Sequence, residues 1–328
     1  MSKLHAKIAG LGKYLPERIL SNADLEKMVD TSDEWITKRV GIKERRISDD
    51  ATFASDLAAK AAENALKDAG MKAEELDLII VSTVSPDMYT PSVSCLVQKK
   101  IGASRAAAFD INAACSGFIF AMTTAVQYIE NGLYQKILVL GSDTLSKITE
   151  YQDRATCVLF GDGAGAAVLV ATEEETGVLS CFLGSDGASG DCLTIPGLRC
   201  DEIDRERRPF GNPRTIWMDG SAVFKFAVKV MDFATRKVVE DAGKSMEDLA
   251  LVVPHQANWR IIDGARKRMK LESNKVFSNI EKYGNMSAAC VPIALCEAVE
   301  EGRAKRGDLV AIVSMGGGLT WGAVLFEL

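Results

Sequence analysis

Cys115 is the residue of this sequence whose surroundings most favour chemistry. It stands where an extended apolar stretch ends in small residues and a helix-like pattern begins that continues to Ile129. This arrangement predicts a thiol at the N-terminus of a buried helix, where the helix dipole favours the nucleophilic thiolate. The small residues at 113–114 and 116–117 leave room for a substrate beside the sulfur. A buried cysteine acting as a small hydrophobic residue is the commoner case, so the assignment depends on other residues.

Two polar side chains could assist such a nucleophile. His255 follows the apolar residues 251–253 and is the only histidine besides His5. A lone histidine at a strand end is often a hydrogen-bonded core residue, but its unperturbed pKa suits proton transfer near neutrality. Asn285 precedes a helix-like stretch, where it could cap the helix or donate its amide N–H to a substrate carbonyl. The two residues are therefore candidate catalytic partners of Cys115.

Two glycine-rich runs allow different interpretations. Glycines 316–318 follow a strand predicted at 308–313 and could form a tight loop. They could also bring backbone N–H groups to a substrate oxygen, as an oxyanion hole requires. The run 161–165 precedes the apolar stretch 166–170, whereas a dinucleotide-binding fingerprint needs a strand, then glycines, then a helix. We interpret this second run as closely packed backbone.

Aromatic and basic residues suggest an anionic ligand. Thr31 and Glu34 have the spacing of a capping box, and Trp35 and Arg39 lie four residues apart on the helix that follows. That pair could hold a ligand with an aromatic ring and phosphates. A basic cluster at 260–268 follows His255; it is either a solvated surface or, in an acidic chain, a site for an anionic partner.

The elements that must position these side chains occur twice in the chain. Residues 67–82 and 240–255 each predict a helix ended by glycine, a short acidic turn and a buried parallel strand, at an offset of 173 residues. The repeat continues less clearly at an offset of 170, which places Cys115 and Asn285 at matching helix starts. We expect two α/β halves, 1–177 and 178–328, whose strand ends and helix starts meet at one centre.

The composition excludes several classes of protein. The chain has 328 residues, 47% of them hydrophobic, and a net charge of −6, so no overall basic field favours nucleic acid. No signal-peptide core follows the first residues, and no apolar run reaches the roughly 20 residues that span a bilayer. Two histidines exclude a histidine-rich metal site, and eight cysteines without a Cys-x-x-Cys pair indicate reduced thiols. We expect a cytoplasmic enzyme without metal, nucleic-acid or membrane partners, and an exposed, lid-like connection at 187–217.

In combination and order, these motifs closely resemble the 3-oxoacyl-[acyl-carrier-protein] synthase III family over essentially the whole chain. The motifs are Cys115 at a helix start, Pro-His-Gln-Ala-Asn at 254–258, Gly-Asn-x-Ser at 284–287 and Gly-Gly-Gly-x-Thr-Trp-Gly at 316–322. The resemblance implies a thiolase fold, with duplicated halves in α-β-α-β-α layers, in a homodimer. It implies the initiating condensing enzyme of dissociated fatty-acid synthesis, which uses acyl-CoA and malonyl-acyl-carrier-protein as substrates and needs no cofactor.

The resemblance also implies a role for each matching residue. Cys115 would take the acyl group, His255 and Asn285 would bind the malonyl thioester carbonyl, and the N–H groups of Cys115 and Gly317 would form the oxyanion hole. Coenzyme A would contact six residues: Thr31, Trp35, Arg39, Arg154, Phe224 and Asn258. The acyl carrier protein would meet four basic residues: Lys225, Arg260, Lys267 and Arg268.

Three departures from the family pattern concern the acyl pocket. Met315 stands where phenylalanine is usual. Thr90 stands where members restricted to short straight primers tend to carry phenylalanine, at a position that reaches the partner's acyl pocket. The smaller side chain predicts longer or branched primers. The connection at 198–213 is longer than in familiar members.

Two alternative functions remain open. One is a related enzyme that primes a polyketide or secondary pathway, or that transfers acyl groups to an oxygen or nitrogen acceptor. The other is a non-catalytic subunit of a heterodimer. The presence of both His255 and Asn285 favours condensation over simple transfer, and an intact Cys115 argues against a non-catalytic subunit.

Overall fold

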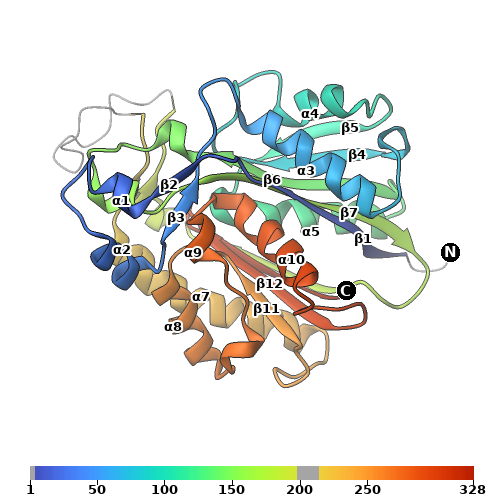
Figure 1. The fold of residues 1–328 in the computed structure, drawn as a ribbon. Helices are drawn as coiled ribbons and strands as arrows, with labels where there is room; N and C mark the ends of the chain where they lie inside the picture. Colours follow the sequence, from blue (N-terminus) through green and yellow to red (C-terminus); the bar gives the residue numbers. More distant parts are fainter. Residues whose placement is uncertain (1–3, 198–213) are drawn as a thin grey trace.

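Two β-sheets organise residues 4–197 and 214–328, the part of the chain that the computed structural model describes (Figure 1). The first sheet has the strand order β1-β7-β6-β4-β5, with bounds His5–Tyr14, Asp162–Thr172, Lys136–Thr144, Leu78–Ser82 and Ala107–Ile111. The second has the order β11-β12-β13-β8, with bounds Leu251–Pro254, Leu309–Gly316, Thr320–Glu327 and Val178–Ser185.

The two sheets repeat one topology, which confirms the predicted duplication. In the first sheet, β7 pairs antiparallel with β1 and β6, and β4 pairs parallel with β6. In the second, β13 pairs antiparallel with β8 and β12, and β11 pairs parallel with β12. At the place of β5, the described part of the second half has an isolated parallel bridge between Val252 and Val276. All strands of the first sheet precede residue 173, and those of the second follow residue 177.

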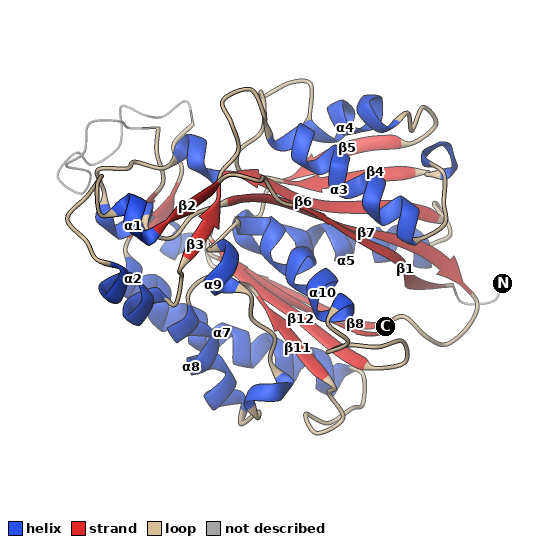
Figure 2. Ribbon diagram, in the orientation of Figure 1, coloured by secondary structure: helices blue, strands red, loops and turns tan. Residues whose placement is uncertain are grey.

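Helices cover both sheets and fill the space between them, which gives the predicted α-β-α-β-α layers (Figure 2). The outer helices of the first sheet are α3 (Ala54–Asp68) and α4 (Val93–Ile101). The central layer is formed by α5 (Gly117–Glu130) and α10 (Cys290–Glu300). The outer helices of the second sheet are α7 (Gly220–Asp241) and α8 (Trp259–Met269).

Shorter elements lie around these layers. They are β2 (Ile19–Ser21), α1 (Asn22–Leu25), α2 (Asp33–Val40), β3 (Glu44–Arg46), η1 (Ala73–Glu75), η2 (Ala114–Ser116), η3 (Leu145–Ile148), α6 (Arg154–Cys157), η4 (Gly187–Cys192), β9 (Leu193–Thr194), β10 (Trp217–Met218), η6 (Ser273–Lys275), α9 (Ile280–Tyr283) and η7 (Ser287–Ala289).

The sequence of each helix matches its layer. The central helices α5 and α10 are apolar on nearly every side because a sheet lies against each face. The outer helices α3 and α7 are amphipathic, and each is followed by a glycine with positive φ, Gly70 at 62° and Gly243 at 66°. Glycine adopts this left-handed conformation without strain, so it ends the two helices at equivalent positions, as predicted.

Near Cys115 and Asn285, the residues that correspond between the two halves differ from those that the sequence predicted. Gly117 begins α5 and Cys290 begins α10, which keeps the offset at 173 residues. The same offset relates Ala114 and Ser287, whose φ angles of 48° and 50° are both positive. Asn285 therefore corresponds to Asn112 and not to Cys115. The predicted equivalence at an offset of 170 is wrong, because that estimate compared approximate helix starts only.

Close packing explains the glycines at 161–165. A Cβ atom on Gly165 would lie 2.8 Å from the backbone nitrogen of Ile293 on α10. The run belongs to the start of β7, where the central helix approaches the strand backbone. This confirms the interpretation of the run as closely packed backbone.

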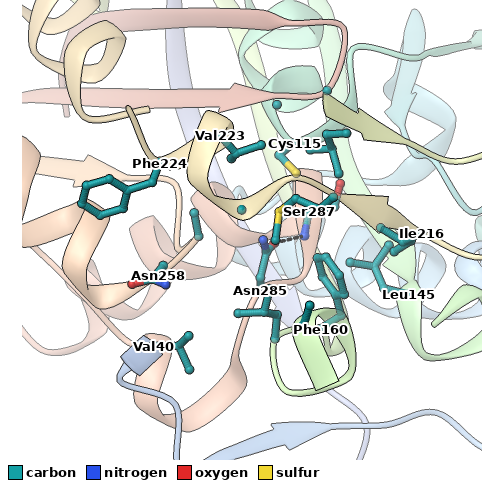
Figure 3. A pocket seen from close by; sticks show the side chains of 18 of the residues that line it. Val40, Cys115, Leu145, Phe160, Ile216, Val223, Phe224, Asn258, Asn285 and Ser287 are labelled. Carbon is teal, nitrogen blue, oxygen red and sulfur yellow. Dashed lines mark hydrogen bonds between the residues drawn. The ribbon is translucent and has the colours of Figure 1, made fainter. Parts of the chain in front are cut away.

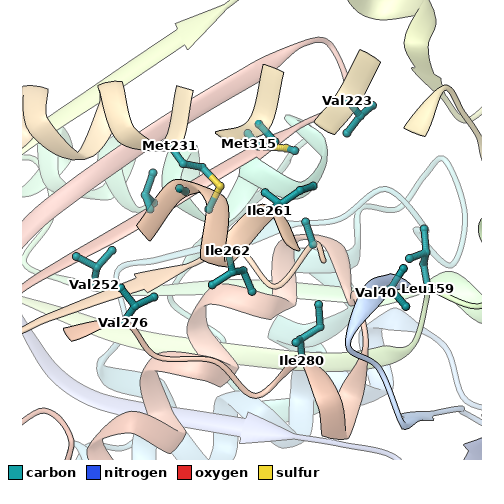
Figure 4. Packing of buried hydrophobic residues seen from close by; sticks show 14 of the residues in the cluster. Val40, Leu159, Val223, Met231, Val252, Ile261, Ile262, Val276, Ile280 and Met315 are labelled. Atoms are coloured by element: carbon teal, nitrogen blue, oxygen red, sulfur yellow. The ribbon is translucent and has the colours of Figure 1, made fainter. Parts of the chain in front are cut away.

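One hydrophobic cluster connects the second half to residues of the first (Figure 4). Ile262 and Met231 join α8 and α7 beside the second sheet, and Val40 of α2 packs into the same cluster. Val223 and Met315 belong to this cluster and also line a large cavity. The packed core therefore forms one wall of that cavity.

Candidate active site

A cavity of about 1290 Å³ lies between the two halves and receives most of the predicted site residues. Cys115, His255 and Asn285 all line it, although they come from three separate elements. Figure 3 shows Cys115, Ser287 and Asn285 gathered together, with Phe224 and Asn258 further along the cavity. Other predicted residues that line it are Gly317, Trp35, Arg39, Arg154, Phe224, Asn258, Lys225, Arg260 and Met315.

Cys115 lies in η2, directly before α5, as predicted. The turn between β12 and β13 lies against its backbone: a Cβ atom on Gly316 would come within 2.5 Å of the Cys115 nitrogen. Ser314 Oγ donates to the Cys115 carbonyl oxygen at 2.7 Å, which ties β12 to the same residue. The absence of a side chain at Gly316 therefore allows the backbone of residues 316–317 to lie beside Cys115.

Burial changes the expected ionisation of Cys115. Desolvation raises the pKa of the thiol to about 12, and the nearby carboxyl of Asp143 also raises it. A helix start alone would favour the thiolate, but removing the charged sulfur from water has the larger effect here. Cys115 is therefore a neutral thiol near pH 7 in this structure, and a reaction at its sulfur must include a route for its proton.

Burial keeps His255 neutral near pH 7. It follows β11, and its backbone N–H donates to the Val313 oxygen at 2.8 Å. Burial lowers the pKa of the imidazole to about 3, because no negative charge offsets the desolvation of the cation. Its Nδ1 has no hydrogen-bond partner among the described residues. A neutral imidazole carries one N–H and can donate it to a substrate oxygen without carrying charge.

Asn285 is oriented by its own backbone turn. Its Oδ1 accepts the N–H of Ser287 at 2.8 Å (Figure 3). The same oxygen lies 3.7 Å from the sulfur of Cys290. Because the oxygen already accepts a hydrogen bond, the Nδ2 hydrogens are the part of the amide that can donate to a ligand in the cavity. Asn285 does not cap a helix, since α10 begins at Cys290 and has Ala289 at its N-cap. The functional interpretation is therefore favoured over capping.

An aromatic and basic group forms one mouth of the cavity. The guanidinium carbon of Arg154 lies 4.9 Å from the ring centre of Trp35, and that of Arg39 lies 6.0 Å from it. Ser32, not Thr31, caps the helix α2 that carries Trp35, because Ser32 Oγ accepts the Trp35 N–H at 3.1 Å. The predicted capping box is wrong by one residue, and Thr31 does not line the cavity.

The predicted carrier-protein residues divide into two groups. Lys225 and Arg260 line the cavity, and the guanidinium of Arg260 lies 5.7 Å from the ring centre of Phe224. Lys267 and Arg268 lie outside the cavity lining and pair with acidic side chains, Asp263 at 2.7 Å and Asp232 at 3.0 Å. Asn258 caps α8 through its Oδ1, which accepts the Arg260 N–H at 2.8 Å.

The interior of the cavity is apolar. Met315 is buried in its wall, as predicted, and the other apolar residues include Leu145, Val158, Leu159, Phe160 and Ile216. Thr90 is exposed on the loop after β4 and does not line the cavity of its own chain. Its role at a partner's acyl pocket therefore stays a prediction.

The predicted connection at 187–217 contributes to the cavity. Strand β9 within it pairs antiparallel with β10 at its end, and three of its side chains line the cavity, Leu193, Ile195 and Ile216, together with the adjacent Met218. The alternation of apolar residues at these positions was the signal that could have revealed them. The predicted long insertion at 198–213 lies outside the described residues.

Comparisons with known proteins agree with this geometry. A family model described as 3-oxoacyl-[acyl-carrier-protein (ACP)] synthase III matches residues 109–187, and a model of its C-terminal part matches residues 239–328. Beta-ketoacyl-[acyl-carrier-protein] synthase III of Caldanaerobacter subterraneus subsp. tengcongensis is 54% identical over 325 residues, which cover 99% of this chain and 98% of that protein.

Solved structures give the same result. The 3-oxoacyl-[acyl-carrier-protein] synthase III of Aquifex aeolicus VF5 is 47% identical, with a TM-score of 0.92 that covers 98% of this chain and all (100%) of that one. The priming beta-ketosynthase from the R1128 polyketide biosynthetic pathway is 32% identical, with a TM-score of 0.93 that covers 100% of this chain and 97% of that one.

The duplicated fold, the convergence of a thiol, an imidazole and an amide, and the full-length similarity all point in one direction. The chain belongs to the 3-oxoacyl-[acyl-carrier-protein] synthase III family and is a thiolase-fold condensing enzyme that initiates fatty-acid synthesis.

Proposed function

We propose that this chain transfers an acyl group from acyl-CoA to Cys115 and condenses it with malonyl-acyl-carrier-protein. The products are CoA, CO2 and a 3-oxoacyl-acyl-carrier-protein. One observation carries the proposal: Cys115, His255 and Asn285 line one cavity, although they come from the two halves of the molecule. A family likeness over nearly the full length supports it.

In the first half-reaction, Cys115 attacks the thioester carbonyl of acyl-CoA and becomes acylated. The reaction divides one difficult transfer into two easier ones. The negative oxygen that forms would accept hydrogen bonds from the backbone N–H groups of Cys115 and Gly317. The close approach of the 316–317 backbone to Cys115 supports this oxyanion hole.

In the second half-reaction, the malonyl group loses CO2 and the resulting enolate attacks the acyl-Cys115 thioester. No strong base is needed, because the departing CO2 leaves its electron pair on the carbon. Neutral N–H donors of His255 and Asn285 would stabilise the enolate oxygen, and each could contribute about 3 kcal/mol. The low pKa of His255 supports its role as a neutral donor.

Coenzyme A would enter past Trp35, with its adenine ring against the indole and its phosphates near Arg39 and Arg154. The pantetheine arm would pass Phe224 and Asn258, which line the way to Cys115. Thr31 would contact the same arm only if its side chain turns towards the cavity, because it does not line the cavity here.

The acidic acyl carrier protein would bind next to the opening. The chain carries a net charge of −6, so an acidic partner needs a local basic surface. Lys225 and Arg260 lie at the cavity, and Lys267 and Arg268 continue the basic surface along α8.

We also propose that the protein works as a homodimer in the cytoplasm without a metal or nucleotide cofactor. Tyr89 is 80% exposed and Met88 is 47% exposed, side by side on the loop that carries Thr90, and a second copy could cover them. Within residues 4–197 and 214–328, no helix has the length and apolar character needed to cross a membrane. The proposed chemistry uses only side chains and backbone groups of the protein.

Priming of a polyketide pathway is the second candidate function. The structural likeness to the R1128 priming beta-ketosynthase favours it, but that protein shares 32% identity against 54% for the fatty-acid relative. Both enzymes would use the same first half-reaction, so the identity of primer and acceptor distinguishes them. An intact set of Cys115, His255 and Asn285 argues against a non-catalytic subunit.

The test is the intact mass of the protein after mixing with a panel of acyl-CoAs, followed by malonyl-acyl-carrier-protein. We expect one acyl adduct, located on Cys115, that disappears as 3-oxoacyl product forms, and no adduct on Cys115→Ala. An adduct that persists after malonyl-acyl-carrier-protein is added would contradict condensation. An acylated Cys115→Ala variant would refute the nucleophile.

A further inference from the structure

A buried carboxyl group lies behind the nucleophile and has no place in the mechanism above. Asp143, near the end of β6, is 0% exposed and has no ion-pair partner in the described part of the chain. Its Oδ1 accepts four hydrogen bonds of 2.8–3.1 Å from Thr83, Val84 and Ser85, and its Oδ2 accepts the Ala288 N–H at 3.3 Å. The Oδ1 atom is therefore fully engaged, whereas Oδ2, on the side of η7, retains capacity to accept a further bond.

The side chain of Ser287 lies near both this carboxyl group and the nucleophile. Ser287 is 2% exposed and lines the cavity beside Cys115 (Figure 3). The N–H of the next residue, Ala288, donates to Asp143 Oδ2 at 3.3 Å, which places Ser287 beside that oxygen. Burial raises the pKa of Cys115 and of Asp143, and the Ser287 hydroxyl acts in the opposite direction on both. Its Oγ nevertheless forms no hydrogen bond of good geometry among the described residues. An unpartnered buried hydroxyl between two titratable groups is suited to pass a proton.

The backbone holds Ser287 in this place. Its φ of 50° is left-handed, and the Asn285 side chain accepts its N–H at 2.8 Å. A residue other than glycine adopts such a conformation only when its surroundings enforce it. The equivalent residue in the first half, Ala114, has the same conformation and no hydroxyl. The turn therefore forms without a hydroxyl at this position, and we look for the reason for the Ser287 hydroxyl in the function of the site.

We propose that Asp143 accepts the thiol proton of Cys115, through the Ser287 hydroxyl, as the acyl group is transferred. The inference rests on the proposed role of Cys115 as nucleophile. A buried site accommodates one negative charge far better than two. When the proton moves from the thiol to the carboxylate, the negative charge passes from Asp143 to the sulfur. The buried site then still holds one negative charge.

The bonds and protons balance over the full cycle. The Cys115 S–H proton passes to the Ser287 oxygen while the Ser287 proton passes to Asp143 Oδ2, and the sulfur forms the new bond to the acyl carbon. The carbon–sulfur bond of acyl-CoA breaks, and the CoA thiolate takes a proton from water. Condensation later expels Cys115 as a thiolate, which recovers its proton from Asp143 by the same path. The net reaction consumes one proton from solvent, as decarboxylative condensation requires.

The other titratable groups around this pair do not compete for the proton. Cys290, which lies near both, stays a thiol because burial raises its pKa. His255 shares the cavity with Cys115 and stays neutral because burial lowers its pKa to about 3. The segment 83–85 presents only hydroxyl and backbone N–H donors to Asp143. Asp143 is therefore the group that can take up the proton of Cys115.

The test is the single-turnover rate of Cys115 acylation by acyl-CoA, measured by quenched intact mass across pH 6–9. In the natural protein we expect the acylation rate to rise with pH and then to level off once Asp143 is ionised. Ser287→Ala should acylate about 100-fold more slowly at pH 7. Its rate should rise about tenfold per pH unit, because only solvent base can then remove the proton. Asp143→Asn, which cannot take up a proton, should behave in the same way.

Two controls separate a proton path from a structural role. Ser142→Ala removes another buried hydroxyl on β6, one that donates to the Ala54 oxygen at 2.7 Å, and should keep the natural rate and pH profile. Malonyl decarboxylation by Cys115→Ala and by Cys115→Ala/Ser287→Ala should agree within twofold, since that step does not use the thiol.

Two results would overturn the inference: a natural acylation rate and pH profile in Ser287→Ala, or an equal loss of decarboxylation in the double variant. If the natural protein forms no acyl adduct at all, the proposed function fails instead.

Discussion

At the scale of the residue, the site uses groups that are neutral before the substrate arrives. Cys115 is held as a thiol and His255 as a free imidazole, and burial is the largest cause of both shifts. A neutral donor suits an enolate, because its hydrogen bond strengthens as negative charge develops and does not hold the malonyl carboxylate in its ground state. The same burial opposes the removal of the Cys115 proton, which acylation of the sulfur would require.

The two donor residues should be separable from the nucleophile. His255→Ala and Asn285→Ala should each keep acylation of Cys115, because neither residue takes part in that half-reaction. Each should lose malonyl decarboxylation by about 100-fold, the usual effect of removing one such donor. Intact mass reports the first step and release of labelled CO2 the second. Normal condensation by either variant would show that its role is wrong.

Burial of His255 should also make the protein sensitive to acid. Its folded-state pKa of about 3 lies below the usual histidine value of 6.5, so the unfolded chain binds a proton that the folded protein does not. This contribution to stability is complete above pH 6.5 and is lost as the pH falls from there towards 3. Between pH 7 and pH 5 it should lower the free energy of unfolding by about 2 kcal/mol.

Urea unfolding of the natural protein and of His255→Asn at both pH values measures this effect. The natural protein should lose about 2 kcal/mol more than the variant between pH 7 and 5. His5→Asn, which removes the other histidine, is the control and should behave like the natural protein. An equal loss in all three proteins would show that other groups cause the acid sensitivity.

At the scale of the element, short helices present the ligand-binding side chains to the cavity. The two turns of α2 carry Trp35 and Arg39 on one side, and Asn258 caps the helix that begins beside Arg260. The functional side chains thus lie at helix starts and strand ends, where backbone hydrogen bonding stops and side chains take over.

The cap of α2 provides a matched pair of variants. Ser32→Ala should lower the free energy of unfolding by about 1 kcal/mol, because the Trp35 N–H loses its acceptor. It should also raise the KM for acyl-CoA, since Trp35 is then less firmly held. Thr31→Ala should change stability much less, because Thr31 Oγ1 makes no hydrogen bond in the described residues. A larger loss of stability in Thr31→Ala than in Ser32→Ala, measured by urea unfolding, would show that Thr31 is the cap.

At the scale of the whole molecule, one repeated topology builds an asymmetric site. Both halves contain the same asparagine turn before a central helix: Asn112 Oδ1 accepts the Ala114 N–H at 3.2 Å, as Asn285 Oδ1 accepts that of Ser287. The first copy continues into Cys115 and the second into Ala288. Duplication therefore supplies one backbone frame twice, with the proposed nucleophile in one half and the proposed enolate donors in the other.

The acyl pocket should depend on assembly of two copies. Thr90→Phe should lower kcat/KM for branched or longer acyl-CoAs by about tenfold relative to acetyl-CoA, because a ring would shorten the pocket. Thr90→Ser, of nearly the same size, is the control and should keep the natural preference. Sedimentation of the natural protein and of each variant establishes whether each one is the proposed dimer. An unchanged primer preference in a dimeric Thr90→Phe variant would remove Thr90 from the pocket.

The sequence by itself determined the family, the duplicated α/β halves and the identity of the central residues. Periodic apolar patterns and glycine stops are local, so the pair 67–82 and 240–255 could be compared without coordinates. The order of the motifs then predicted roles for Cys115, His255 and Asn285, and all three line one cavity. The cap at Ser32 was missed because two adjacent hydroxyl residues, Thr31 and Ser32, suit the same local pattern.

Only the tertiary structure decided which groups surround the sulfur. Asp143 and Ser287 are 144 residues apart along the chain, and nothing in a local pattern brings them to Cys115. The correspondence between Asn285 and Asn112, and the apolar cavity lining at 193–195 and 216–218, required the same long-range packing. The ionisation of Cys115 and His255 depends on how completely water is excluded, and that is a property of the packed halves together and not of any segment alone.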